Sequence, residues 1–176
     1  RFDNSDKQRL TASTASDWAF LHDGSAFTHY IVINFGEASV NTFATTNYGG
    51  STSNNGYWLV RDDRNNSNDL ELVVAKGSGR GVIESTLSNE APTNTDLIYV
   101  VQFDGEDQYR IDRRKTTIAS PTGTGHSTND PKNPFSMGYN KDYLNSDVGR
   151  HLIYKSYHDN STKADVVDAL ANQFGI

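Results

Sequence analysis

The sequence of 176 residues contains no cysteine, only 4 prolines and a single methionine. Without cysteine the chain forms neither a disulfide framework nor a thiolate zinc site. No apolar run approaches the roughly 20 residues that a membrane-spanning helix needs, so we expect no membrane partner. The formal net charge of -6 gives a field that repels polyanions, which argues against nucleic acid as a partner.

What the sequence does contain is typical of a compact domain with many turns. The 14 glycines stand among many Asn, Ser, Thr and Asp residues, which accept the backbone conformations of tight turns. The sequence contains 8 Phe, 9 Tyr and 2 Trp residues that can pack in the core. A chain of this length buries roughly 70% of the surface that it exposes when unfolded, so we expect one domain with a full core.

Alternating apolar residues predict strands along most of the chain. In Ala26–Phe35 the residues Phe27, His29, Ile31 and Ile33 fall on one face at period two. Turn residues separate this run from further strand-like runs, which are Gly56–Arg61, Leu70–Ala75, Val82–Leu87, Leu97–Phe103, Gln108–Ile118, Phe135–Tyr139 and Val148–Tyr154. Many short strands without interleaved helices predict an all-β fold, an antiparallel sandwich of two sheets.

The end of the chain departs from this pattern and predicts one helix over about residues 162–174. An apolar stripe recurs there at helical spacing, formed by Val167, Leu170, Ala171 and Phe174. Thr162 and Asp165 resemble a capping box, and Gly175 stands where a C-terminal cap is expected. We therefore expect the helix to lay its apolar stripe on the sandwich.

Four segments in a fixed order give the chain a family resemblance. They are Ser16–Gly24, Tyr99–Gly105, Phe135–Tyr139 and the ending Gly149–Tyr154 before the helix. This order resembles the concanavalin A-like, laminin G-like domains of phage structural proteins. The resemblance implies a jelly-roll sandwich over residues 16–176. Residues 1–15 are then predicted to be a connector or an N-terminal arm.

The residues needed for polysaccharide cleavage are not evident. Retaining glucanases of this superfamily need a pair of carboxylates about 5 to 5.5 Å apart, carried by an alternating strand pattern. The sequence offers only Asp69-Leu70-Glu71, which fits a solvated strand edge better. We therefore predict that the domain is not an enzyme.

Histidine and tryptophan positions favour structural roles. Five histidines are present, and no two have the spacing of a metal-binding motif. His29 is expected to be a hydrogen-bonded core residue, because it lies on the apolar face of its strand. His22 is expected to shape a turn, and Trp58 to join the core.

Two interpretations stay open for the polar stretch around residues 62–68. Laminin G-like relatives often hold one calcium ion with Asp and Asn side chains, and Asp62, Asp63 and Asn65 supply such hard oxygen ligands. Asp- and Asn-rich turns also form for backbone reasons alone. Calcium is therefore one alternative at this turn, and no cofactor is required.

Loop aromatics and one basic cluster are the candidate ligand-binding residues. Tyr48, Tyr139 and Tyr143 lie in or beside predicted loops, where their rings would stack on sugar faces or anchor a protein interface. Arg113 and Arg114 belong to a basic cluster that would either meet an acidic surface of a partner or form a solvated turn.

Together these patterns predict a non-catalytic surface-binding domain on a virion or outside the cell. The resemblance implies a capsid decoration or tail-fibre module that engages other virion proteins and host glycans, with a homotrimer as a common arrangement. The alternative is a secreted bacterial jelly-roll enzyme that acts on polysaccharide, or its carbohydrate-binding module.

Overall fold

The computed structural model describes residues 10–36, 41–47, 54–62, 68–77, 81–137 and 146–176. In chain order the elements are β1 (Leu10–Ala12), the 3-10 helix η2 (Ser16–Leu21), β2 (Phe27–Phe35), β3 (Asn41–Thr45), β4 (Asn55–Asp62), β5 (Asp69–Lys76), β6 (Gly81–Leu87), β7 (Asp96–Phe103), β8 (Tyr109–Arg113), β9 (Thr116–Ala119), β10 (Phe135–Met137), β11 (Ser146–Tyr154) and α1 (Asn160–Phe174).

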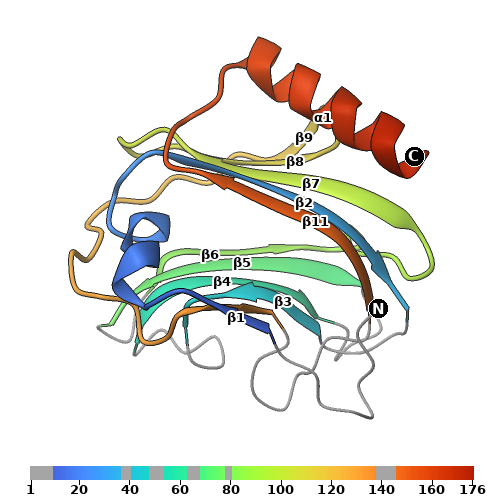
Figure 1. The fold of residues 1–176 in the computed structure, drawn as a ribbon. Helices are drawn as coiled ribbons and strands as arrows, with labels where there is room; N and C mark the ends of the chain where they lie inside the picture. The colour runs from blue at the N-terminus through green and yellow to red at the C-terminus, as the bar shows by residue number, and fades with distance from the viewer. Residues whose placement is uncertain (1–9, 37–40, 48–53, 63–67, 78–80, 138–145) are drawn as a thin grey trace.

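The strands form two antiparallel sheets that face each other, with α1 on the outside (Figure 1). The six-stranded sheet has the order β1-β10-β3-β4-β5-β6, and the five-stranded sheet has the order β11-β2-β7-β8-β9. The predicted fold class, a jelly-roll sandwich with a C-terminal helix, is confirmed.

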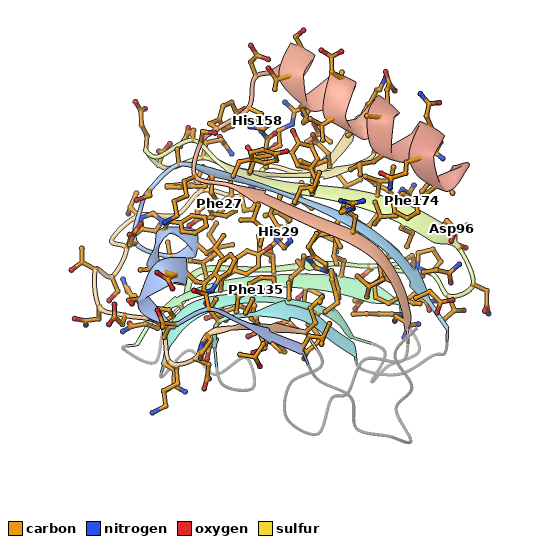
Figure 2. The ribbon with its side chains drawn as sticks, viewed as in Figure 1. Phe27, His29, Asp96, Phe135, His158 and Phe174 are labelled. Atoms are coloured by element: carbon orange, nitrogen blue, oxygen red, sulfur yellow. The ribbon has the colours of Figure 1, made fainter. Side chains whose placement is uncertain are left out.

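The main core fills the space between the sheets. Successive side chains of a strand point to opposite faces, so alternate residues of each strand enter it. In β2 these are Phe27, Ile31 and Ile33, all at most 1% exposed. His29 lies on the same inward face and is completely buried, as its place in the pattern predicts. Figure 2 shows His29 and Phe27 between the two layers.

Helix α1 covers the outer face of the five-stranded sheet. Val167 and Leu170 are 2% and 4% exposed and pack on the outward side chains Tyr30, Ile98 and Val100 of β2 and β7. The predicted stripe is thus confirmed. The helix thus covers the outward side chains of β2 and β7.

Charged side chains also hold α1 to the sheet. The Asp112 carboxylate, in β8, is completely buried and accepts hydrogen bonds from Lys163 of α1 and from Arg110 (2.8 Å). An exposed ion pair between Lys115 and Asp168 joins the β8–β9 turn to the middle of α1.

The helix begins before the predicted residue. Asp159 is the N-cap, and its side chain accepts a hydrogen bond from the backbone N–H of Thr162 at 2.7 Å. The predicted capping box of Thr162 and Asp165 is therefore wrong, because Thr162 is already the third residue of the helix. Gly175 ends the helix in the left-handed conformation, as predicted, and its N–H donates to the carbonyl of Ala171.

Most predicted strands agree with the structure to within a few residues, but two regions differ. The run Gln108–Ile118 is divided into β8 and β9, because Arg114 turns the chain with a φ of 56°. The short strands β1 and β3 were not predicted. β1 belongs to the segment predicted as a connector or arm, and it pairs with β10 as the edge of the six-stranded sheet.

Trp58 is 8% exposed, which confirms its burial, but it faces away from the main core. It clusters with Val60, Val73 and Ala75 on the outer face of β4 and β5. In the part of the chain that the structure describes, no helix has the length and apolar character to cross a membrane.

Candidate functional site

The two edge strands β1 and β11 leave one side of the sandwich open. β1 ends the six-stranded sheet and β11 ends the five-stranded sheet, and both lie on the same side of the molecule (Figure 1). A cavity of about 440 Å³ lies between them. We call it the edge groove, and its lining residues are Leu10, Thr11, Ala12, Trp18, Phe135, Met137, His151 and Ile153.

The edge groove is a strip of core that neither sheet covers. Its apolar side chains come from the inward faces of β1, β10 and β11, and Phe135 is 5% exposed in the main core (Figure 2). Leu10 stands at the rim and is 54% exposed, the highest value among the exposed large hydrophobic residues described. The arrangement offers an apolar surface that a ligand can reach without disturbing the fold.

Trp18 closes one end of the edge groove. The 3-10 helix η2 presents its ring, and the ring N–H donates to the carbonyl oxygen of Ala12 at 2.8 Å. The ring centroid lies 4.9 Å from that of Phe135. The hydrogen bond fixes the ring by its edge, so an aromatic wall faces the cavity.

A short chain of hydrogen bonds leads from the edge groove into the core. His151 of β11 lies beside His29 of β2, with His29 Nε2 and His151 Nδ1 2.8 Å apart. His29 Nδ1 lies 3.2 Å from the hydroxyl of Tyr57 in β4. The three side chains thus connect both sheets through the interior of the sandwich.

Burial keeps this chain uncharged at neutral pH. It lowers the pKa of His151 to about 4 and the pKa of His29 well below its usual value, and the neighbouring His151 lowers the latter further. Burial also raises the pKa of the Tyr57 phenol far above its usual value. All three groups therefore act as neutral hydrogen bond partners.

The predicted basic candidates lie elsewhere. Arg113 ends β8 and pairs with Glu90 at 2.9 Å, and Arg114 follows in the β8–β9 turn. Both line a separate shallow cavity of about 430 Å³ near the start of β7. This cavity is on the β8–β9 side of the five-stranded sheet, opposite the edge formed by β11.

The other candidates from the sequence cannot be placed. Tyr48, Tyr139 and Tyr143, and also Asp63 and Asn65, lie outside the described residues. Asp62 ends β4, where its backbone pairs with Asp69. Among the described residues, no group of three His, Cys, Asp or Glu side chains is arranged to hold a metal ion. Calcium binding by residues 62–65 stays a prediction.

The sequence pattern missed the edge groove because its parts are far apart in the chain. His29 and His151 have no motif spacing, and they meet only because β11 pairs with β2 so that Ile31 lies opposite His151. His22 lies just after η2 and bonds the carbonyl of Asn129 at 2.9 Å, in keeping with the predicted turn.

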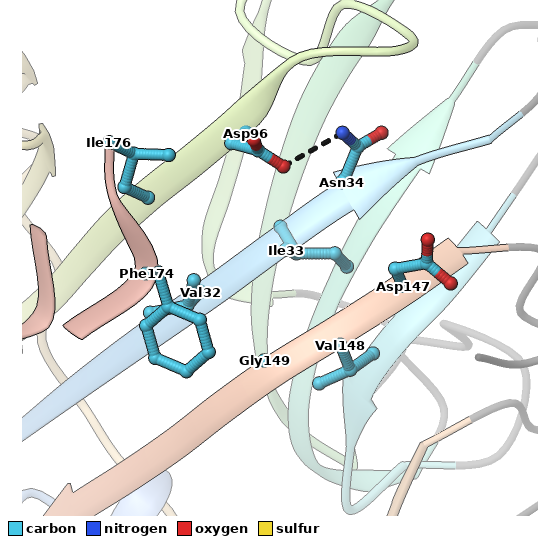
Figure 3. Close-up of a pocket in the computed structure, with 9 residues that line it drawn as sticks. All are labelled: Val32, Ile33, Asn34, Asp96, Asp147, Val148, Gly149, Phe174 and Ile176. Carbon is cyan, nitrogen blue, oxygen red and sulfur yellow. Dashed lines mark hydrogen bonds between the residues drawn. The ribbon is translucent and has the colours of Figure 1, made fainter.

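A smaller cavity of about 280 Å³ lies where the end of α1 meets β11 (Figure 3). Phe174 and Val32 form part of its floor, and Asn34 donates a hydrogen bond to Asp96 at its rim (2.8 Å). Gly149 lies in a bulge of β11 against the Phe174 ring. The cavity therefore lies beside the contact between β11 and the C-terminal end of α1.

The sequence matches no protein-family model and no curated protein. Solved structures share its fold. The binding domain of botulinum neurotoxin DC in complex with SialylT is 11% identical, with a TM-score of 0.68 over 92% of this chain and 39% of the toxin chain. The same toxin domain in complex with rat synaptotagmin II is also 11% identical, with a TM-score of 0.64 over 92% and 39% of the two chains.

A third structure is described by the statement that cell entry of botulinum neurotoxin type C depends on interaction with two ganglioside molecules. It is 12% identical, with a TM-score of 0.65 over 92% of this chain and 39% of the toxin chain. At these identities the likeness shows the sandwich fold alone. Because this chain spans about two fifths of the toxin chains, the bound sugar and protein of those complexes cannot be assigned to the shared part.

Proposed function

We propose that this chain is a non-catalytic binding domain that attaches to a protein neighbour through the edge groove. The observation that carries the proposal is the open strip of core between β1 and β11, lined by Trp18 and Phe135. Apolar surface exposed beside aromatic anchors is typical of protein contact sites. The outer face of the five-stranded sheet is unsuited to this task, since α1 covers it.

The sequence resemblance extends the proposal to the setting in which the domain works. We propose a place on the surface of a virus particle, as a capsid decoration or tail-fibre module mounted as a homotrimer. The neighbour is then another virion protein. Structures of toxin domains in complex with a sugar and with a receptor protein support the use of this fold for attachment, and they leave the setting open.

A peptide library displayed on phage and selected against the domain tests the edge groove. The change Leu10→Glu puts a charge at the rim, and it spares the core because Leu10 is 54% exposed. We expect selected peptides to lose at least about tenfold in affinity for this variant, since a buried charge without a partner is strongly unfavourable. The control is Thr117→Glu in β9, an exposed residue at the opposite edge. Equal binding to wild type and both variants would refute the proposal.

A second function, glycan binding, is favoured by two exposed aromatic residues, one at the end of β11 and one in its connection to α1. Tyr154 and Tyr157 are 37% and 42% exposed, and such rings stack on sugar faces. A glycan array comparing wild type with Tyr157→Ala tests this function. Sugars retained equally by the variant would exclude this site.

A further inference from the structure

His151 places one unused hydrogen-bonding atom at the edge groove. Its Nδ1 bonds His29, whereas its Nε2 is buried and has no hydrogen bond partner among the described residues. Buried polar atoms in folded proteins are nearly always paired, and an unpaired one at a binding cavity points to a ligand atom. The protonation of this nitrogen therefore decides which ligands fit.

The hydrogen-bond chain fixes where the proton of His151 lies. A neutral imidazole has one N–H donor and one acceptor nitrogen. If the Tyr57 hydroxyl donates to His29 Nδ1, then His29 Nε2–H donates to His151 Nδ1, and His151 carries its own proton on Nε2. Both hydrogen bonds between Tyr57 and His151 then have a donor and an acceptor, and only His151 Nε2–H is left for a ligand.

The opposite direction leaves a buried group without a partner. If His151 Nδ1–H donated to His29, then His29 Nδ1–H would donate to Tyr57, and the hydroxyl hydrogen of Tyr57 would need another acceptor. Among the described residues His29 is the only hydrogen-bond partner of the Tyr57 oxygen, and Tyr57 is completely buried. A buried donor without an acceptor carries the full desolvation penalty of the group. His151 therefore presents an N–H donor to the edge groove.

This donor is the main polar group on an otherwise apolar wall. Of the lining side chains only Thr11 and His151 are polar, and the Thr11 hydroxyl is within hydrogen-bond distance of Ser136 at 3.3 Å. A pyranose ring brings several hydroxyl groups, each of which would lose its water without a replacement. One donor suits a ligand with one acceptor oxygen beside an apolar group.

The strand β11 adds the backbone of a recognition site. Within the part of the chain that the structure describes it pairs only with β2, so its other edge is available to an extended chain. Peptides bind such edges by main-chain hydrogen bonds, and pockets for alternate side chains provide specificity. The bulge at Gly149 interrupts the ladder, and residues from Arg150 to Tyr154 are the longer of the two regular parts of β11.

Resting on the proposed function, we infer that the ligand of the edge groove is an extended peptide segment. It inserts one apolar side chain beside Trp18 and Phe135, and one of its carbonyl oxygens accepts a hydrogen bond from His151 Nε2–H. The partner is thus a protein that presents an exposed, extended, apolar stretch of chain.

The tautomer is tested on the protein without any ligand. Long-range proton–nitrogen NMR spectra at neutral pH distinguish protonated from unprotonated imidazole nitrogens. We expect His151 to carry its proton on Nε2 and to leave Nδ1 unprotonated, with the same tautomer at His29. A proton on Nδ1 of His151 would overturn the inference.

Two small probes then test the class of ligand, N-acetyl-phenylalanine N′-methylamide as the peptide and a methyl pyranoside as the sugar. We expect the peptide probe to shift the NMR resonances of Trp18 and His151, and the sugar to leave them in place. In His151→Leu the affinity for the peptide probe should fall roughly fivefold, as the loss of one hydrogen bond implies. Arg150→Ala, on the other face of β11, is the control.

The outcomes separate this inference from the proposed function. If Leu10→Glu abolishes binding of the peptide probe and His151→Leu does not, the edge groove is the site and the hydrogen bond from His151 is refuted. If the sugar alone shifts Trp18, the peptide class is refuted. If neither probe shifts Trp18 or His151, the inference falls, and peptides selected from the library still decide the proposed function independently.

Discussion

The buried pair of Asp112 and Lys163 gives the sharpest prediction about how the fold is held together. The two side chains are 0% and 3% exposed, so their mutual attraction replaces the water that each has lost. Asp112→Asn leaves the ammonium group of Lys163 in the layer under α1 without a counter-charge. Removing one partner of such a pair costs about 3 to 5 kcal/mol. The cost of Lys163→Met should lie at the lower end of this range, because Asp112 keeps its ion pair with Arg110.

A double-mutant cycle measured by urea unfolding, followed by tryptophan fluorescence, checks this reasoning. We expect the variant with both changes to cost at least about 2 kcal/mol less than the sum of the single changes, because neither charge is left buried alone. The control is Asp168→Asn, whose partner Lys115 is half exposed, and it should cost at most about 1 kcal/mol. Single variants that cost less than about 1 kcal/mol would refute the view that this pair anchors the helix.

The remaining predictions concern packing, pH and catalysis. Leu170→Ala should lower the free energy of unfolding by about 2 to 5 kcal/mol, and a neutral result would contradict the packing of α1. Gly149→Val should cost about 1 to 3 kcal/mol in the same assay, since a Cβ there would lie 2.7 Å from the Phe174 ring. Because the pKa of His151 is about 4 when folded, unfolded chains take up a proton first as the pH falls below about 6.5, so His151 alone should cost about 2 kcal/mol of stability by pH 5 in an acid titration. The buried His29, whose pKa also lies well below its usual value, should add to this loss. The variant Asp69→Asn with Glu71→Gln should keep all binding, and cleavage of polysaccharide that vanishes in it would show an enzyme instead.

The strands that the sequence predicts well are long runs rich in β-branched and aromatic residues. β2 and β7 are such runs, and both of their faces are buried. The apolar stripe of Val167 and Leu170 identifies α1 with equal clarity. β3 was missed because five residues give too short a pattern. The boundary between β8 and β9 was missed within the run Gln108–Ile118, although a solvated turn was one interpretation of the basic cluster there. Arg114 adopts a positive φ in that turn.

The candidate site was predictable only in fragments. Alternation places His29 on an inward face, which correctly predicts a buried, hydrogen-bonded residue. That His151 is its partner depends on the pairing register of β11 with β2, which no local pattern contains. The same holds for Trp18 and Phe135, which become neighbours through η2 and β10.

The position of β2 has a consequence for the order in which the domain folds. β2 ends at Phe35 and is hydrogen-bonded on one side to β7 and on the other to β11, which begins only at Ser146. During synthesis its second edge stays without a partner until β11 has been made. Pairings between such distant segments slow folding and leave strand edges exposed to other chains. Until β11 has been synthesised, the nascent protein should therefore need a low concentration or chaperones to avoid pairing with other chains.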